Sequence, residues 1–120
     1  MSERKVFDLE QRTTELAKQV IMLCRQLPRN PVLDPIANQV VRSAGSIGAN
    51  YREANDALGR KDFVYRLRIV RKEAKETLHW LNLLKAAQID KAQVIDVLIK
   101  ESFELKNIFS KMIINVQGIN

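Results

Sequence analysis

Apolar residues recur every three or four positions along almost the whole chain, and this spacing restricts the possible folds more than any other feature. It is the spacing of one face of an α-helix, and no segment of useful length alternates as a half-buried strand would. Short polar breaks divide the pattern into four parts. It therefore predicts helices over about residues 8–27, 35–58, 61–87 and 91–115.

Capping and turn residues mark the predicted helix ends. Two pairs have the spacing of a capping box, with an acid three residues before a glutamine: Asp8 with Gln11, and Asp90 with Gln93. Asp34-Pro35 combines a capping acid with proline at the first helical position. The P-R-N-P stretch at 28–31 breaks the chain before it, and Gly59 is expected to end the second helix.

The predicted helices are similar in length, about 30–39 Å at a rise of 1.5 Å per residue. Short connections between helices of matched length favour antiparallel neighbours. We therefore expect an all-α protein in which residues 1–120 form one domain, an antiparallel up-down-up-down four-helix bundle.

Several classes of protein are excluded by what the chain lacks. The longest apolar runs have a few residues, far fewer than the roughly 20 that span a bilayer, and the first residues, M-S-E-R-K-V-F-D, lack the apolar core of a signal peptide. We expect a cytoplasmic protein with no membrane association. Cys24 is the single cysteine and His79 the single histidine, so we expect no disulfide, no metal site and no cofactor.

A second apolar facet is predicted on the third and fourth helices, away from their core-facing stripes. At about 100° per residue, five large side chains fall there: Tyr65, Ile69, Trp80, Ile99 and Phe103. Ile114 lies on the same side. Such a patch favours self-association, so we expect a homo-oligomer with these residues at its interface. A wide core and a groove for a partner protein are the alternatives.

Basic residues are concentrated in the third predicted helix. Residues 60–76 hold seven Lys or Arg and three carboxylates, a net charge of +4 out of +6 for the whole chain. We interpret this segment, with two arginines of the second helix, as a phosphate-contacting surface made of Lys61, Arg68, Arg71, Lys72, Lys75, Arg42 and Arg52. The alternative is a solvated face with pairs such as Lys72–Glu76. No base-reading motif is present, so any binding would depend on backbone or shape.

Polar residues flank the core stripe of the second helix, most densely in the stretch S-I-G-A-N-Y-R-E-A-N at 46–55. Ser46, Asn50 and Glu53 lie about one helical turn apart, close enough to bind a neighbouring helix or the Lys61–Phe63 turn. Gly48, in the middle of the helix, would permit a close helix approach. The core stripe predicted for the last helix is Val94, Leu98, Glu101, Leu105, Ile108 and Met112. Glu101 at such a position favours a buried hydrogen-bond network that fixes helix register.

Several stretches resemble the family of four-helix bundle proteins encoded in 23S ribosomal RNA intervening sequences, over roughly residues 6–115. They are F-D-L at the start, V-R-S-A-G-S-I-G-A-N-Y-R-E-A at 41–54, K-D-F at 61–63 and K-E-A-K-E-T-L-H-W-L at 72–81. The signature residues carried over are Ser46, Ile47, Ala49, Asn50, Glu53, Lys61, Asp62, Phe63, Glu73 and Glu76. The chain departs from the family at Gly48, where proline is frequent, and at Ala54-Asn55, where glycine is frequent.

The resemblance implies a bundle that assembles as a ring-like homopentamer, and no catalytic activity is established for the family. The family is also similar in fold to the accessory variability determinant of diversity-generating retroelements, a basic pentameric bundle that partners a reverse transcriptase and nucleic acid. We therefore expect a non-enzymatic oligomer that binds RNA or a nucleic-acid-processing protein. A protein-interaction scaffold is the alternative, and a metal-dependent nuclease using Glu53, Glu73 or Glu101 is a more distant one.

Overall fold

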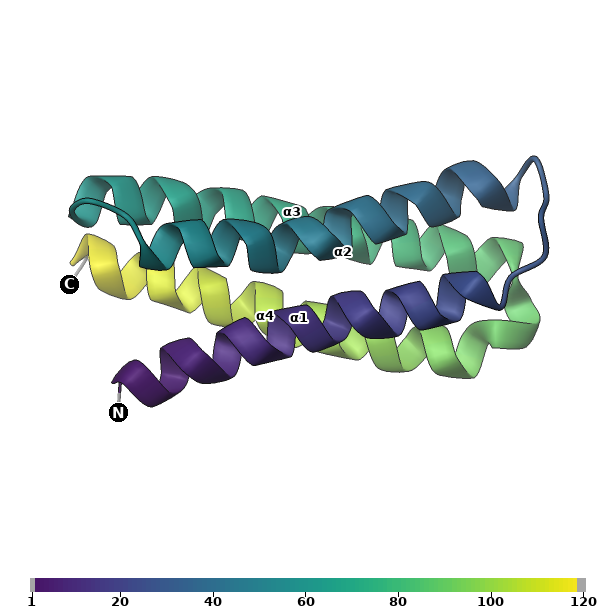
Figure 1. The fold of residues 1–120 in the computed structure, drawn as a ribbon, viewed down its shortest axis with the longest axis horizontal. Helices are drawn as coiled ribbons and strands as arrows, with labels where there is room; N and C mark the ends of the chain where they lie inside the picture. Colours follow the sequence, from purple (N-terminus) through teal and green to yellow (C-terminus); the bar gives the residue numbers. More distant parts are fainter. Residues whose placement is uncertain (1, 119–120) are drawn as a thin grey trace.

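The computed structural model describes residues 2–118, and their side chains from Asp8 onward. Four long helices account for most of this range (Figure 1): α1 (Ser2–Arg25), α2 (Leu33–Asn55), α3 (Arg60–Ala87) and α4 (Ala92–Gln117). A single turn of 3₁₀ helix, η1 (Ile89–Lys91), leads into α4. Consecutive helices run in opposite directions, so the all-α antiparallel bundle is confirmed.

The helices form an elongated bundle of 46 × 23 × 21 Å. Packing is most extensive between α2 and α3, nearly as extensive between α3 and α4, and much smaller between α1 and α4. The helices thus lie in a square in which α3 is diagonal to α1. Among residues 2–118, no helix is long and apolar enough to cross a membrane.

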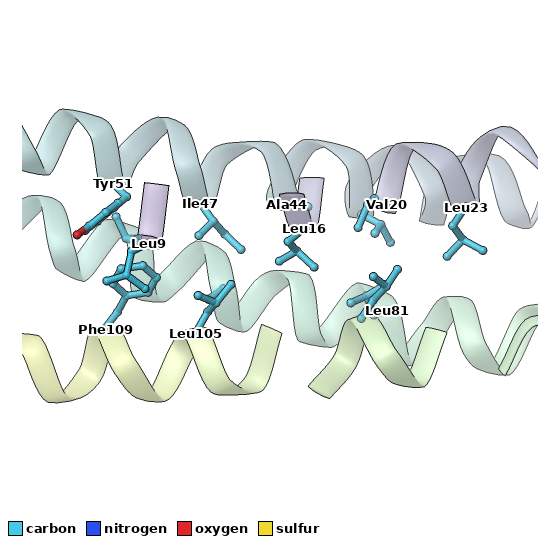
Figure 2. Close-up of a cluster of buried hydrophobic side chains, with 14 of the residues drawn as sticks. Leu9, Leu16, Val20, Leu23, Ala44, Ile47, Tyr51, Leu81, Leu105 and Phe109 are labelled. Atoms are coloured by element: carbon cyan, nitrogen blue, oxygen red, sulfur yellow. The ribbon is translucent and has the colours of Figure 1, made fainter. Parts of the chain in front are cut away.

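The core consists of one apolar stripe from each helix. Figure 2 shows its central part, in which Leu9 and Leu16 of α1 face Leu105 and Phe109 of α4. Tyr51 of α2 is also fully buried, with its ring 5.2 Å from that of Phe109 and inclined by 53°. A tilted contact of this kind adds to the stabilisation that both rings gain from burial.

The start of α1 differs from the prediction. The helix begins at Ser2, so Asp8 and Gln11 lie inside it and the capping box predicted for them is wrong. Residues 2–7 contain no glycine or proline, so nothing in their sequence prevents the helix from beginning earlier.

Asn30 caps the start of α2 instead of Asp34, which was predicted to do so. The Asn30 Oδ1 atom accepts hydrogen bonds from the backbone N–H groups of Val32 (2.7 Å) and Leu33 (3.2 Å), which is the geometry of a helix cap. Asp34 points back and accepts from the Asn30 N–H at 3.2 Å. The Asn30 carbonyl also accepts a hydrogen bond from the Asp34 N–H at 2.8 Å, so the helical turn starts just before the bounds given for α2. Pro31, rather than Pro35, therefore takes the first position after the cap, where its missing N–H has no cost.

The connection between α2 and α3 also differs. Helix α2 ends at Asn55, so Leu58, the last residue of the predicted second helix, lies outside α2 and is 94% exposed. Gly59 does not end α2 but precedes α3, and its carbonyl accepts a hydrogen bond from the Phe63 N–H at 3.1 Å. Its φ of 101° is one that glycine adopts easily and other residues rarely do, which fixes the turn at this position.

In α4 the buried stripe is shifted from the predicted one. Val94 was predicted to be in the core but is half exposed, while Ile95 is fully buried. The observed stripe is Ile95, Leu98, Ser102, Leu105, Phe109 and Ile113.

The start of α4 also differs from the prediction. No side-chain hydrogen bond caps α4 in the described chain, so the capping box predicted for Asp90 and Gln93 is wrong. Asp90 Oδ1 instead accepts a hydrogen bond from Gln88 Nε2 at 2.7 Å.

Gly48 lies at a close approach of α2 to α1, as predicted. A Cβ atom at this position would lie 3.0 Å from Thr13 Oγ1 and 3.4 Å from Thr13 Cβ. The Thr13 hydroxyl is buried and donates to the Leu9 carbonyl of its own helix at 2.8 Å, so it has little freedom to move away. Gly45, one turn earlier, has no described atom within 4 Å of the same position.

Alanine substitution at these two glycines should have opposite effects. Gly45→Ala should raise the free energy of unfolding by about 0.5–1 kcal/mol, because alanine is the better helix former and its methyl group has space. Gly48→Ala should lower it by about 1 kcal/mol, because overpacking against Thr13 exceeds that gain. Urea unfolding of both variants tests this. A Gly48→Ala protein as stabilised as Gly45→Ala would show that Thr13 does not restrict the site.

Candidate nucleic-acid interface

Six exposed side chains form a straight line along the surface of α3 that faces away from the core. They follow one another at spacings of four and three residues, and we call them the outer face of α3: Lys61, Tyr65, Arg68, Lys72, Lys75 and His79. The line extends about 27 Å at 1.5 Å per residue. Since α3 is diagonal to α1, no other helix covers this face in the described chain.

The carboxylates of α3 are occupied by arginines. Arg42 of α2 contacts both Glu73 (3.3 Å) and Glu76 (2.6 Å), and Asp62 lies 3.7 Å from Arg66. The Lys72–Glu76 pair considered from the sequence does not form, because Glu76 is bound to Arg42 instead.

The four cations of the outer face are therefore left without carboxylate partners. Among the side chains described, none of Lys61, Arg68, Lys72 and Lys75 is within ion-pair distance of an acid. Arg71, half buried on the same helix, likewise has no carboxylate partner within that part of the chain. Positive potential accumulates along α3 as a result.

Two shallow depressions border the outer face and share Arg68. The first, of about 810 Å³, is lined by Arg60, Lys61, Val64, Tyr65, Arg68 and Gln117. The second, of about 470 Å³, is lined by Arg68, Arg71, Lys72, Lys75, Glu76, His79 and Trp80. Arg60 also donates a hydrogen bond from Nε to the Val116 carbonyl oxygen at 2.6 Å, which satisfies a terminal carbonyl of α4.

Aromatic rings lie among these cations. Tyr65 is 60% exposed, and the guanidinium of Arg66 lies 6.0 Å from its ring centre. The His79 and Trp80 rings are 4.9 Å apart and nearly perpendicular, at 73°. Trp80 is partly buried against the core, so it supports the exposed ring of His79.

The two arginines of α2 do not join the outer face. Arg42 is engaged with the two glutamates of α3. Arg52 points toward α1, where it contacts Glu10 Oε1 at 2.9 Å and Thr14 Oγ1 at 3.3 Å. The predicted phosphate-contacting set is thus divided between two sides of the bundle.

The residues predicted for the oligomer interface are also divided. Ile69 is half buried, and Trp80 and Ile99 pack partly against the core. Tyr65 and Phe103 are more exposed, but Tyr65 borders a cationic depression. The Phe103 ring, 50% exposed on α4, has Lys106 Nζ 4.4 Å from its centre.

The signature residues of α2 bind their own helix rather than a neighbour. Ser46 Oγ donates to the Arg42 carbonyl at 2.9 Å, and Asn50 Nδ2 donates to the Ser46 carbonyl at 2.8 Å. Glu53 is exposed. The expected bonds from Ser46 and Asn50 to a neighbouring helix or the Lys61–Phe63 turn are therefore wrong, because carbonyls one turn back satisfy both side chains. Phe63 packs partly against the core.

Glu101 lies at the edge of the core and joins α4 to α1, which was not predicted. Arg12 contacts it through two hydrogen bonds, Nε to Oε2 at 3.0 Å and Nη2 to Oε1 at 2.8 Å. This hydrogen bonding raises the pKa of Arg12.

The three glutamates considered for catalysis, Glu53, Glu73 and Glu101, lie on three different helices. Among the described residues, no three potential ligands form a metal-binding group.

A buried hydrogen bond also joins α2 to α3. Thr77 Oγ1 lies 3.0 Å from Ser43 Oγ and 2.8 Å from the Glu73 carbonyl oxygen, and its single proton serves one of them at a time. Ser43 donates to the Gln39 carbonyl at 2.8 Å. A buried polar link of the kind expected from the sequence is thus present at Ser43, with Thr77 as its partner, while Glu101 lies outside it.

The geometry is that of a small helical bundle with a cationic, aromatic face. The chain belongs to the 23S rRNA-intervening sequence protein family, whose model matches residues 5–111. A crystallised protein of unknown function from the S23 ribosomal protein family of Bacteroides thetaiotaomicron is 32% identical, with a TM-score of 0.78 over 87% of this chain and 96% of that one. No curated protein matches the sequence.

Breaking the Arg12–Glu101 pair should destabilise the bundle. Both side chains are about 30% exposed, at 29% and 31%, so the pair is screened less than a fully exposed one. We expect Glu101→Gln to lower the free energy of unfolding by about 1 kcal/mol. Asp96→Asn, which breaks the more exposed Lys85–Asp96 pair, should change it by less than about 0.5 kcal/mol. Equal effects in urea unfolding would contradict this ranking.

Tyr51 should make the fold sensitive to alkali. Burial raises the pKa of its phenol, and its hydroxyl has no hydrogen-bond partner among the described atoms. The unfolded chain ionises near pH 10 while the folded chain keeps the proton, so stability should fall as pH rises from there toward the higher folded pKa.

Tyr51→Phe should remove the loss of stability at alkaline pH that ionisation of Tyr51 causes. It should change the free energy of unfolding at pH 7 by less than about 1 kcal/mol. Urea unfolding at neutral and alkaline pH, in a Cys24→Ala background, measures it, since burial also raises the pKa of that thiol. Tyr65→Phe, which leaves Tyr51 in place, should retain the fall. An unchanged pH dependence in Tyr51→Phe would refute the assignment.

Proposed function

We propose that this protein is a non-catalytic, oligomeric RNA-binding module that contacts phosphates through the outer face of α3. The supporting observation is that four cations of this face have no carboxylate partner in the described chain, while the acids of the same helix are held by Arg42 and Arg66. A cation already paired with a carboxylate would lose that partner on binding a phosphate. These four lose none, so counterion release contributes fully to binding.

Self-association belongs to the same proposal. The resemblance described above implies a ring of five subunits, and Phe103 and Ile114 of α4 are each about half exposed. In such a ring each subunit would repeat the outer face of α3, so a long RNA could contact several faces at once. The gain in avidity would compensate for a modest affinity at each face.

Binding should weaken steeply with salt and depend on the outer face. For four phosphate contacts to a single strand, we expect the logarithm of the association constant to fall with the logarithm of salt concentration with a slope of about −3 per face. Arg68→Ala/Lys72→Ala should reduce this slope by about 1.4. Fluorescence anisotropy of a short labelled RNA, titrated at several salt concentrations, measures both quantities.

A matched control removes the same charge elsewhere. Lys18→Ala/Lys111→Ala takes two exposed lysines from α1 and α4, away from the outer face. If it weakened binding as much as Arg68→Ala/Lys72→Ala, the net charge and not the outer face would be responsible. Light scattering of the same samples reports the subunit number, and a monomer would refute the oligomeric part of the proposal.

A protein-interaction scaffold is the second candidate, and the exposed ring of Phe103 favours it. In that case the cations would serve solubility, and low-salt titration with RNA would show no binding. Partner proteins recovered with the purified chain would then remain bound after nuclease treatment and be lost in Phe103→Glu.

A further inference from the structure

We infer that the nucleic acid recognised by the outer face of α3 is single-stranded, with bases stacked on Tyr65 and on His79 while the cations between them hold the phosphates. This inference rests on the proposed function and specifies its ligand. It is carried by the position of the aromatic rings, which phosphate binding alone does not require.

Cations and rings share one line on α3. From Tyr65 to His79 the order is ring, cation, cation, cation, ring, with Arg68, Lys72 and Lys75 between the two aromatic positions. The separation of 14 residues corresponds to about 21 Å. A stacked strand would span it with about six nucleotides at 3.4 Å each, which falls within the site sizes of known single-strand binders.

The rings are placed so that a base can reach them. Tyr65 is 60% exposed and borders the depression of about 810 Å³, while His79 and Trp80 border that of about 470 Å³. Trp80 is fixed against the core and meets the His79 ring edge-on at 4.9 Å. Support from behind limits the orientations of His79, which reduces the entropy lost when a base stacks on it.

A duplex could use the cations but not the rings. Its bases are paired and stacked on one another, so its sides present phosphates, sugars and groove edges. The outer face is a straight helix surface, with no loop or wedge in the described chain to separate base pairs. Unpaired bases can turn toward the protein, and each base stacked on an aromatic side chain contributes about 1–3 kcal/mol.

The test compares three labelled probes of one length: a single-stranded RNA, its blunt duplex, and a strand of the same phosphates with abasic sugars. The single-stranded RNA should bind the unaltered protein at least about tenfold more tightly than either other probe. Tyr65→Ala and His79→Ala should each weaken its binding about 5- to 150-fold. Both variants should leave the affinities for the duplex and for the abasic strand unchanged. Tyr65→Phe should keep the affinity for the single-stranded RNA.

Trp80 provides an independent readout, because it is the only tryptophan in the chain. Stacking of a base at His79 should change its fluorescence when the single strand binds, and the abasic strand should not produce this change. The signal should be lost in His79→Ala and retained in Tyr65→Ala.

The outcomes separate the inference from the proposed function. If all three probes bind equally and Tyr65→Ala has no effect, while Arg68→Ala/Lys72→Ala weakens binding, the inference is overturned and the phosphate-binding function stands. If no probe binds at low salt, the proposed function itself fails. Loss of duplex binding in Tyr65→Ala would also overturn the inference, since it would indicate a change in the fold or the charge.

Discussion

The packing of α2 against α3 determines most of what this structure presents to its surroundings. Their stripes interlock in the most extensive interface of the bundle, with the Ser43 and Thr77 hydroxyls in contact inside it. At its edge, Arg42 binds both Glu73 and Glu76. Without that arginine, Glu76 would be available to Lys72, one helical turn away. The positive character of α3 thus depends on a residue of its neighbour.

Much of the fold could be predicted from the spacing of apolar residues, because a helix that buries one face must have an apolar residue at every third or fourth position. The spacing could not predict which apolar stripe of α4 faces the core. Val94 and Ile95, Ile108 and Phe109 are adjacent apolar residues, so two neighbouring stripes fit the pattern equally well. Three-dimensional packing decides between them, and it places Ile95 and Phe109 inside. The start of α2 is ambiguous in the sequence for a similar reason: Asn30-Pro31 and Asp34-Pro35 are both capping signals, and the structure uses the first.

The candidate site was predicted in part. The cations of α3 could be identified because a charge cluster is visible in one dimension. The ion-pair partners of charged side chains could not be identified from the sequence, since the Arg12–Glu101 and Arg52–Glu10 pairs join residues far apart in the chain. The sequence favours self-association for Tyr65, Trp80 and Phe103, because an exposed ring has the same pattern whether it contacts a protein or a base. Their position beside unpaired cations is a property of the folded surface alone.

The weak contact between α1 and α4 has a consequence for how the molecule opens. Helix α1 has the least packing of the four, and the Arg12–Glu101 pair is a main polar link across that interface. Free energies of local opening follow buried contact, so α1 should separate in a sub-global fluctuation before the other three helices unfold. Amide hydrogens of α1 would then exchange with solvent sooner than those of α2 and α3. Such an opening would briefly uncover Leu105 and Phe109, while the outer face of α3, on the diagonal, would keep its shape.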